Sequence, residues 1–121
     1  MPISRNDIYF VELGPTRGSE LDTKRRPVVV VSVDELNDLS HVIVVVPGTS
    51  MKSRRRAFFN EVLVEPTADN GLTSPTLFQC HQIKALDPSR FTHERIGILG
   101  DDDVLAIENC IRLCLGLEEE I

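Results

Sequence analysis

Two short runs of β-branched residues constrain the fold of this chain most strongly. Residues 28–31 are four consecutive valines, and residues 42–46 read Val-Ile-Val-Val-Val. β-branched side chains pack well on a pleated sheet, and a strand that is apolar on both faces is buried on both sides. Arg26 and Pro27 precede the first run, and Thr49 follows the second. We therefore expect two core strands, each with a polar residue held rigidly at one end.

The remaining pattern is a series of short strands followed by one long helix. Strands are predicted at residues 8–13, 28–33, 42–46, 58–64, 76–85 and 95–99, and the strand at 76–85 is either straight or bent midway. A short helical turn is predicted at residues 35–39, capped by Ser32 or Asp34, and a long helix at residues 101–117. This order predicts a mainly β (α+β) fold, namely a small SH3-like barrel of short antiparallel strands with a C-terminal helix. We expect a single domain over residues 1–121.

The charge of the chain limits the kinds of partner that it can bind. There are 13 Lys/Arg and 19 Asp/Glu residues, which give a formal net charge of -6 at pH 7. The first sixty residues hold nine of the basic residues and seven of the acidic ones, so the composition allows a small basic site but not a broad basic face. The sequence shows no secretion signal, in which charged residues precede an apolar segment, and no apolar span long enough to cross a membrane. It has three cysteines, an odd number that fits reduced thiols better than a set of disulfides. We therefore expect a cytoplasmic protein.

Five segments of the chain also carry a resemblance to a known family. They are Asp7-Ile8-Tyr9-Phe10, Gly14-Pro15-Thr16-Arg17-Gly18-Ser19-Glu20, Arg26-Pro27-Val28-Val29-Val30, Val46-Pro47-Gly48-Thr49-Ser50 and Gln82-Ile83-Lys84-Ala85-Leu86-Asp87. In this order they resemble the MazF/PemK (Kid-like) toxin ribonucleases of toxin–antitoxin systems. The resemblance implies the same SH3-like fold, a homodimer, single-stranded RNA bound in the groove between subunits, and inhibition by a cognate antitoxin.

The resemblance singles out three residues as catalytic. In the family, the arginine before this proline is catalytic, which assigns Arg26 to the stabilisation of charge on phosphate. The family's Pro-x-Thr motif assigns Thr49 to a hydrogen bond with phosphate, and His81 occupies a position at which some relatives have a proton-accepting aspartate. Histidine can act as an acid or a base near neutral pH. Residue type alone also allows a solvated charge at Arg26, a turn hydroxyl at Thr49 and a structural histidine at His81.

Six further residues are predicted to bind substrate. They are Ser19, Glu20, Ser50, Lys52, Arg54 and Lys84. Glu20 is a candidate for orienting Arg26, with a plain surface acid as the alternative. Lys52 and Arg54 belong to a basic run that can follow an RNA backbone, or that forms a solvated loop.

The predicted chemistry needs neither a metal nor a cofactor. Cys110 and Cys114 share a helix face, but only Cys80 remains to join them, so buried apolar cysteines fit better than a zinc site. RNA supplies its own nucleophile, the 2′-hydroxyl, and the protein must align it and neutralise phosphate charge. We therefore predict a sequence-preferring, metal-independent endoribonuclease toxin that cleaves single-stranded RNA such as mRNA. The alternative is a non-catalytic binding module of the same fold, such as a CcdB-like gyrase-binding toxin or a degenerate toxin that only binds antitoxin or RNA.

Overall fold

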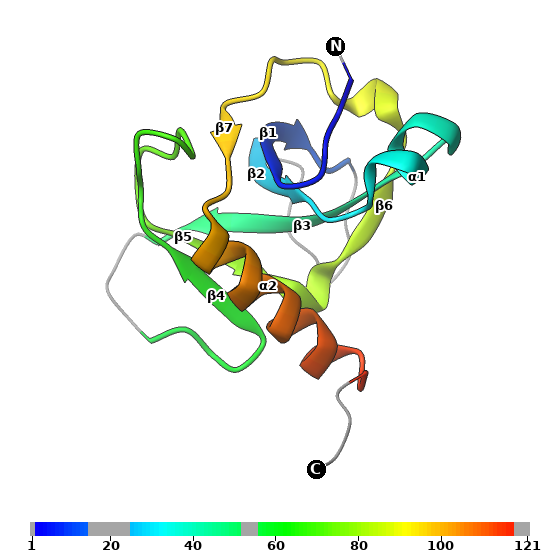
Figure 1. Cartoon of the computed structure of the whole chain (residues 1–121). Coiled ribbons are helices and arrows are strands. Elements are labelled where there is room, and N and C mark those ends of the chain that lie inside the picture. Colours follow the sequence, from blue (N-terminus) through cyan, green and yellow to red (C-terminus); the bar gives the residue numbers. More distant parts are fainter. Residues whose placement is uncertain (1, 15–24, 52–55, 118–121) are drawn as a thin grey trace.

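The chain forms a curled antiparallel sheet with a C-terminal helix (Figure 1). The computed structural model describes residues 2–14, 25–51 and 56–117. Within these residues the elements are β1 (Asp7–Glu12), β2 (Arg25–Val30), α1 (Asp34–Leu39), β3 (Ile43–Ser50), β4 (Glu61–Val64), β5 (Thr76–Gln79), the 3₁₀ helix η1 (Cys80–Gln82), β6 (Lys84–Leu86), the 3₁₀ helix η2 (Pro88–Arg90), β7 (Gly97–Ile98) and α2 (Asp101–Cys114). The strand order is β4-β5-β3-β2-β1-β7, with β6 also paired to β3. The predicted mainly β barrel with a C-terminal helix is confirmed.

The sheet is organised around β3. One edge of β3 pairs with β2, and the other edge pairs with β6 near its start and with β5 near its end. The segment predicted as one strand over residues 76–85, straight or bent midway, is two strands, because the helix η1 separates β5 from β6. The physical reason is Cys80, which is fully buried in the same core cluster as Ile107 and Cys110 of α2. Burying this side chain against α2 takes the backbone off the sheet ladder for one turn.

A close approach of β5 extends β3 beyond the predicted residues 42–46. A Cβ atom on Gly48 would lie 2.7 Å from Thr76 Cγ2 and 3.1 Å from the ring of Phe78. Glycine leaves room for β5, and Gly48, Thr49 and Ser50 pair with Phe78, Leu77 and Thr76. Thr49 is therefore a strand residue, and its reading as a turn hydroxyl is wrong.

Alternating side chains of the central strands fill two hydrophobic clusters. The cluster that includes α2 contains Ile8, Val29, Val46, Val64, Leu72, Phe78, Cys80, Leu99, Ile107 and Cys110. The other contains Tyr9, Val11, Leu13, Val28, Val30, Ile43, Val45 and Leu86. Val29 thus faces one cluster while Val28 and Val30 face the other, which confirms that the valine run is a strand buried on both sides.

Two strands, β2 and β4, begin three residues away from their predicted starts. β2 begins at Arg25 and ends at Val30, because Arg25 and Arg26 pair with Glu12 and Val11 of β1. Arg26 is therefore fixed inside a ladder rather than standing before a strand. β4 begins at Glu61, because a tight turn precedes it: Phe58 N donates to Glu61 Oε1, and Glu61 N donates to the carbonyl oxygen of Phe58.

The helices also differ in detail from the prediction. The N-cap of α1 is Val33 and not Ser32 or Asp34, because the Ser32 hydroxyl is used elsewhere and accepts a hydrogen bond from Val44 N at 3.0 Å. α2 ends at Cys114, and Leu117 beyond it is exposed. Among the helices of the described residues, none has the length and apolar character needed to cross a membrane.

Candidate active site

Arg26 and Thr49 lie side by side on neighbouring strands. Val28 of β2 lies opposite Pro47 of β3, and continuing this antiparallel register by two residues brings Arg26 opposite Thr49. Arg26 Nη1 donates a hydrogen bond to Thr49 Oγ1 at 2.9 Å. Both residues are only partly buried, so the pair is fixed by the sheet while part of it stays accessible. Two of the three predicted catalytic residues thus meet in space although 23 positions separate them.

The direction of this bond determines what the pair can offer to a ligand. A guanidinium has only N–H donors, so Thr49 must accept from Arg26. The single hydrogen of the Thr49 hydroxyl then points to another acceptor. A charged N–H donor beside an O–H donor is a suitable pair for the oxygens of a phosphate.

Lys84 lies on the same face of the sheet as this pair. It is paired with Val45 of β3, four residues before Thr49, and even-numbered separations along a strand share a face. With a rise of about 3.3 Å per residue, Val45 and Thr49 are about 13 Å apart along β3. Lys84 therefore provides a second cation on this face, at a distance that suits a longer ligand rather than a single phosphate.

Ser50 is separated from the pair by strand alternation. It follows Thr49 directly, which places its side chain on the opposite face of β3. There its Oγ accepts a hydrogen bond from Ser74 Oγ at 3.3 Å. The structure does not bring Ser50 to Arg26.

His81 is exposed on η1, the short helix that runs beside β3. Within the described residues, no hydrogen bond joins it to Arg26 or Thr49. Its exposure leaves the imidazole accessible to solvent, and its role in proton transfer stays a prediction.

A family comparison covers most of the chain, including this site. Residues 4–115 match the sequence model of a family described as PemK-like, MazF-like toxin of type II toxin–antitoxin system. This span contains the Arg26–Thr49 pair and all strands of the described structure. The chain belongs to this toxin family. The resemblance drawn from the sequence segments is thereby confirmed.

Solved structures share the fold of this MazF-like toxin at low sequence identity. A structure titled Mycobacterium tuberculosis toxin MazF-mt6 is 22% identical and covers 93% of this chain and 99% of its own, with a TM-score of 0.73. MazF from Deinococcus radiodurans is 20% identical over 96% of this chain and 98% of its own, with a TM-score of 0.77. A mycobacterial endoribonuclease in complex with its cognate antitoxin is 19% identical over 98% of this chain and 99% of its own, with a TM-score of 0.76. At these identities the likeness concerns the fold.

Four of the predicted substrate-binding residues lie outside the described residues. They are Ser19, Glu20, Lys52 and Arg54. Their roles in this MazF-like toxin stay predictions.

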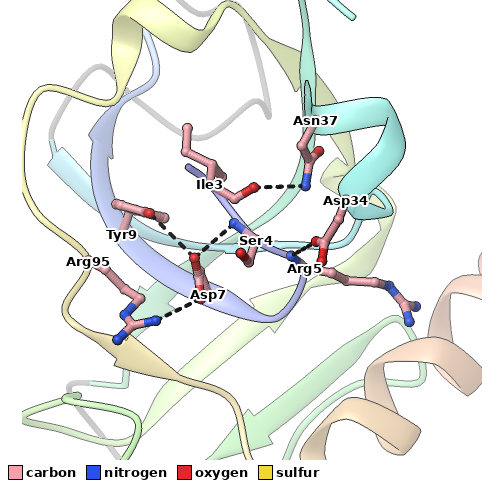
Figure 2. Close-up of polar contacts among 8 residues, drawn as sticks. All are labelled: Ile3, Ser4, Arg5, Asp7, Tyr9, Asp34, Asn37 and Arg95. Atoms are coloured by element: carbon pink, nitrogen blue, oxygen red, sulfur yellow. Dashed lines mark hydrogen bonds and ion pairs between the residues drawn. The ribbon is translucent and has the colours of Figure 1, made fainter. Parts of the chain in front are cut away.

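The Asp7-Ile8-Tyr9-Phe10 segment has a structural role through a polar network (Figure 2). The Asp7 side chain is 3% exposed and accepts hydrogen bonds from Ser4 N at 2.9 Å and, at longer range, from the Tyr9 hydroxyl and Arg95 Nη1. Burial, and then the charge of Asp7, raise the pKa of the Tyr9 phenol. Nearby, Arg5 N donates to Asp34 Oδ1 at 2.8 Å. These contacts fasten the N-terminal segment to α1 and to the segment before β7, and so hold β1 in place beside β2.

The three cysteines meet in the core, as expected for apolar residues. Cys80 and Cys110 are buried, Cys114 is partly buried, and all three are free thiols. Burial, and then a hydrogen bond with Cys110, raise the pKa of the Cys80 thiol, so it stays protonated at neutral pH. Within the described residues, no three or more His, Cys, Asp or Glu side chains are grouped so as to hold a metal ion.

Sequence reasoning missed one polar cluster at the start of β2. Arg25 Nη1 lies 3.2 Å from His93 Nε2, and the Arg25 guanidinium carbon lies 5.3 Å from the centroid of the Phe10 ring. Arg25 stands directly before Arg26 in the basic run, but no local motif marks His93, which is 68 positions away. Only the fold joins these residues.

Proposed function

We propose that this MazF-like toxin is a metal-independent endoribonuclease that cleaves single-stranded RNA, mRNA included, by attack of the 2′-hydroxyl on the adjacent phosphate. The observation that carries the proposal is the 2.9 Å hydrogen bond from Arg26 to Thr49 on two core strands. This hydrogen bond supports the interpretation that Arg26 and Thr49 form a rigid, partly accessible phosphate-binding pair, at the positions that the family motifs indicate. Family membership and the endoribonuclease titles of two structures with this fold add support.

In this mechanism the pair stabilises charge that develops on the phosphate. The guanidinium of Arg26 provides the positive charge, and Thr49 fixes its orientation through their hydrogen bond. As the 2′-oxygen attacks phosphorus, negative charge grows on the non-bridging oxygens, where the N–H and O–H donors are already placed. Because the donors do not have to reorganise, their stabilisation is larger in the transition state than in the bound substrate.

Proton transfer requires a group that can accept and donate a proton, and His81 is the candidate. An exposed imidazole can take the proton of the 2′-hydroxyl or supply one to the leaving 5′-oxygen. The products would then be a cyclic or 3′-phosphate end and a 5′-hydroxyl end.

We also infer the partners of this toxin from its family. A cognate antitoxin protein is expected to inhibit it, because the family belongs to type II toxin–antitoxin systems and relatives of the same fold occur in complexes with antitoxins. A homodimer in the cytoplasm is expected, with RNA in the groove between the subunits.

The proposal is tested by incubating the purified protein with a mixed-sequence RNA in excess EDTA and mapping the ends of the products. We expect cleavage that persists in EDTA and leaves 5′-hydroxyl ends, and that is lost in the Arg26→Ala protein. Cleavage that stops with EDTA and returns with magnesium would overturn the proposed chemistry. RNA binding without cleavage would favour the degenerate toxin.

A further inference from the structure

An apolar cavity of about 360 Å³ lies between the sheet and the two α-helices. Its lining includes Val29 of β2, Val44 of β3, Leu36 of α1 and Ile107 of α2. Val29 stands three residues after Arg26 on β2, and an odd separation along a strand changes the face. The cavity therefore lies on the other face of the sheet from the Arg26–Thr49 pair and is a separate site.

The charges at this cavity are not balanced. Among the described residues, the charged ones that line it are Arg5, Glu108 and Arg112. Arg5 Nη2 donates to Glu108 Oε2 at 2.7 Å, so these two charges neutralise each other. Arg112 is exposed, and its Nη1 donates at 2.8 Å to the neutral amide oxygen of Asn109. Two arginines and one glutamate leave one positive charge here, on a chain with a formal net charge of -6.

This combination determines the chemistry of a matching ligand. Sites for small molecules have volumes of about 300–1,000 Å³ and are mostly apolar, with a few polar groups that fix the orientation of the ligand. A volume of about 360 Å³ is at the small end of that range. The planar guanidinium of Arg112 has five N–H donors, and two of them can bind the two oxygens of a carboxylate side by side. An apolar body with one carboxylate therefore complements both the lining and the charge.

We propose that this cavity binds a small aliphatic monocarboxylate, of the medium-chain fatty acid class, with its carboxylate on Arg112 and its chain between α2 and the sheet. The ligand is held by burial of its methylene groups and by one charged hydrogen-bonding contact. Binding is non-covalent. The proposal does not depend on the ribonuclease function, because the cavity and the Arg26–Thr49 pair lie on opposite faces of the sheet.

The test titrates octanoate into the purified full-length protein and follows binding by NMR chemical shifts. We expect saturable binding that is up to about tenfold tighter than that of hexanoate, because octanoate buries two more methylene groups. Arg112→Ala should weaken octanoate binding about tenfold and leave binding of the uncharged 1-octanol unchanged. The control Arg25→Ala removes an exposed arginine that does not line the cavity, and it should bind octanoate as the wild type does.

A pair of variants on α1 tests the position of the aliphatic chain. Leu36 lines the cavity and is 40% exposed, whereas Leu39 is 86% exposed and does not line it. Leu36→Glu places a second carboxylate at the cavity and should weaken octanoate binding at least tenfold, while Leu39→Glu makes the same change in net charge and should not. A thermal melt checks that both variants are folded. No saturable binding by the wild type, equal affinity for hexanoate and octanoate, undiminished binding by Arg112→Ala, or equal binding by the two α1 variants would each overturn the proposal.

Discussion

Arg26→Ala removes the group that we expect to contribute most to catalysis. The guanidinium is partly buried and is oriented by Thr49 through a 2.9 Å hydrogen bond. Two unit charges about 4 Å apart near a protein surface interact by about 4 kcal/mol, and removal of one preorganised donor from an oxyanion site costs about 3–4 kcal/mol. At about 1.4 kcal/mol per factor of ten, the cleavage rate at saturating RNA should fall roughly 10²- to 10³-fold.

The assay for this variant has to separate catalysis from folding and binding. Arg26→Ala loses the hydrogen bond to Thr49, worth about 1 kcal/mol, and a thermal melt checks that the variant stays folded. Arg25→Ala is the matched control, because it removes the same charge from the neighbouring exposed residue. At saturating RNA its rate should stay near that of the wild type. An Arg26→Ala protein that is folded and cuts at the wild-type rate would refute the assigned role.

Three further predictions concern other residues of the site. Thr49→Ser keeps the hydroxyl and should retain most activity. Thr49→Val loses the acceptor for Arg26 and should lower the single-turnover rate roughly tenfold or more. Equal rates for the two variants would contradict the role of the hydroxyl. His81→Ala should slow cleavage and flatten one limb of the pH–rate profile, and an unchanged rate and profile would make the histidine structural. Gly48→Ala forces a Cβ to 2.7 Å from Thr76 Cγ2 and should lower the free energy of unfolding by about 1–3 kcal/mol in denaturant melts. A free energy of unfolding equal to that of the wild type would show that β5 yields to the added methyl.

The strand pattern and the candidate pair of Arg26 and Thr49 could be predicted from the sequence because their signals are local. The valine run fixes a buried strand, and the Arg26 and Thr49 motifs stand at the ends of two such runs. Their contact also required the right register, which follows from antiparallel pairing of β2 with β3. The start of β2 could not be predicted, since the pairing of Arg25 with Glu12 depends on β1 and not on local propensity.

The errors have a tertiary origin. The predicted strand at residues 76–85 breaks because Cys80 packs against α2, which lies some thirty residues further along the chain. The cluster of Arg25 with His93 was missed for a similar reason, because residues 68 positions apart meet only after the sheet has curled. Side chains alternate between the two faces of a strand, so the face on which Ser50 lies can be derived once β3 is known to continue past Pro47.

The central claim is that the 2′-hydroxyl of the RNA is the nucleophile. The most direct measurement compares two oligonucleotides in EDTA, one entirely ribose and one with a single deoxyribose on the 5′ side of the scissile phosphate. The deoxy substitution leaves unchanged the phosphate that Arg26 and Thr49 are expected to hold, so both should bind with similar affinity. We predict that only the all-ribose oligonucleotide is cut at that bond. Cleavage of the deoxy oligonucleotide at the same bond would mean that water is the nucleophile, and would contradict the mechanism.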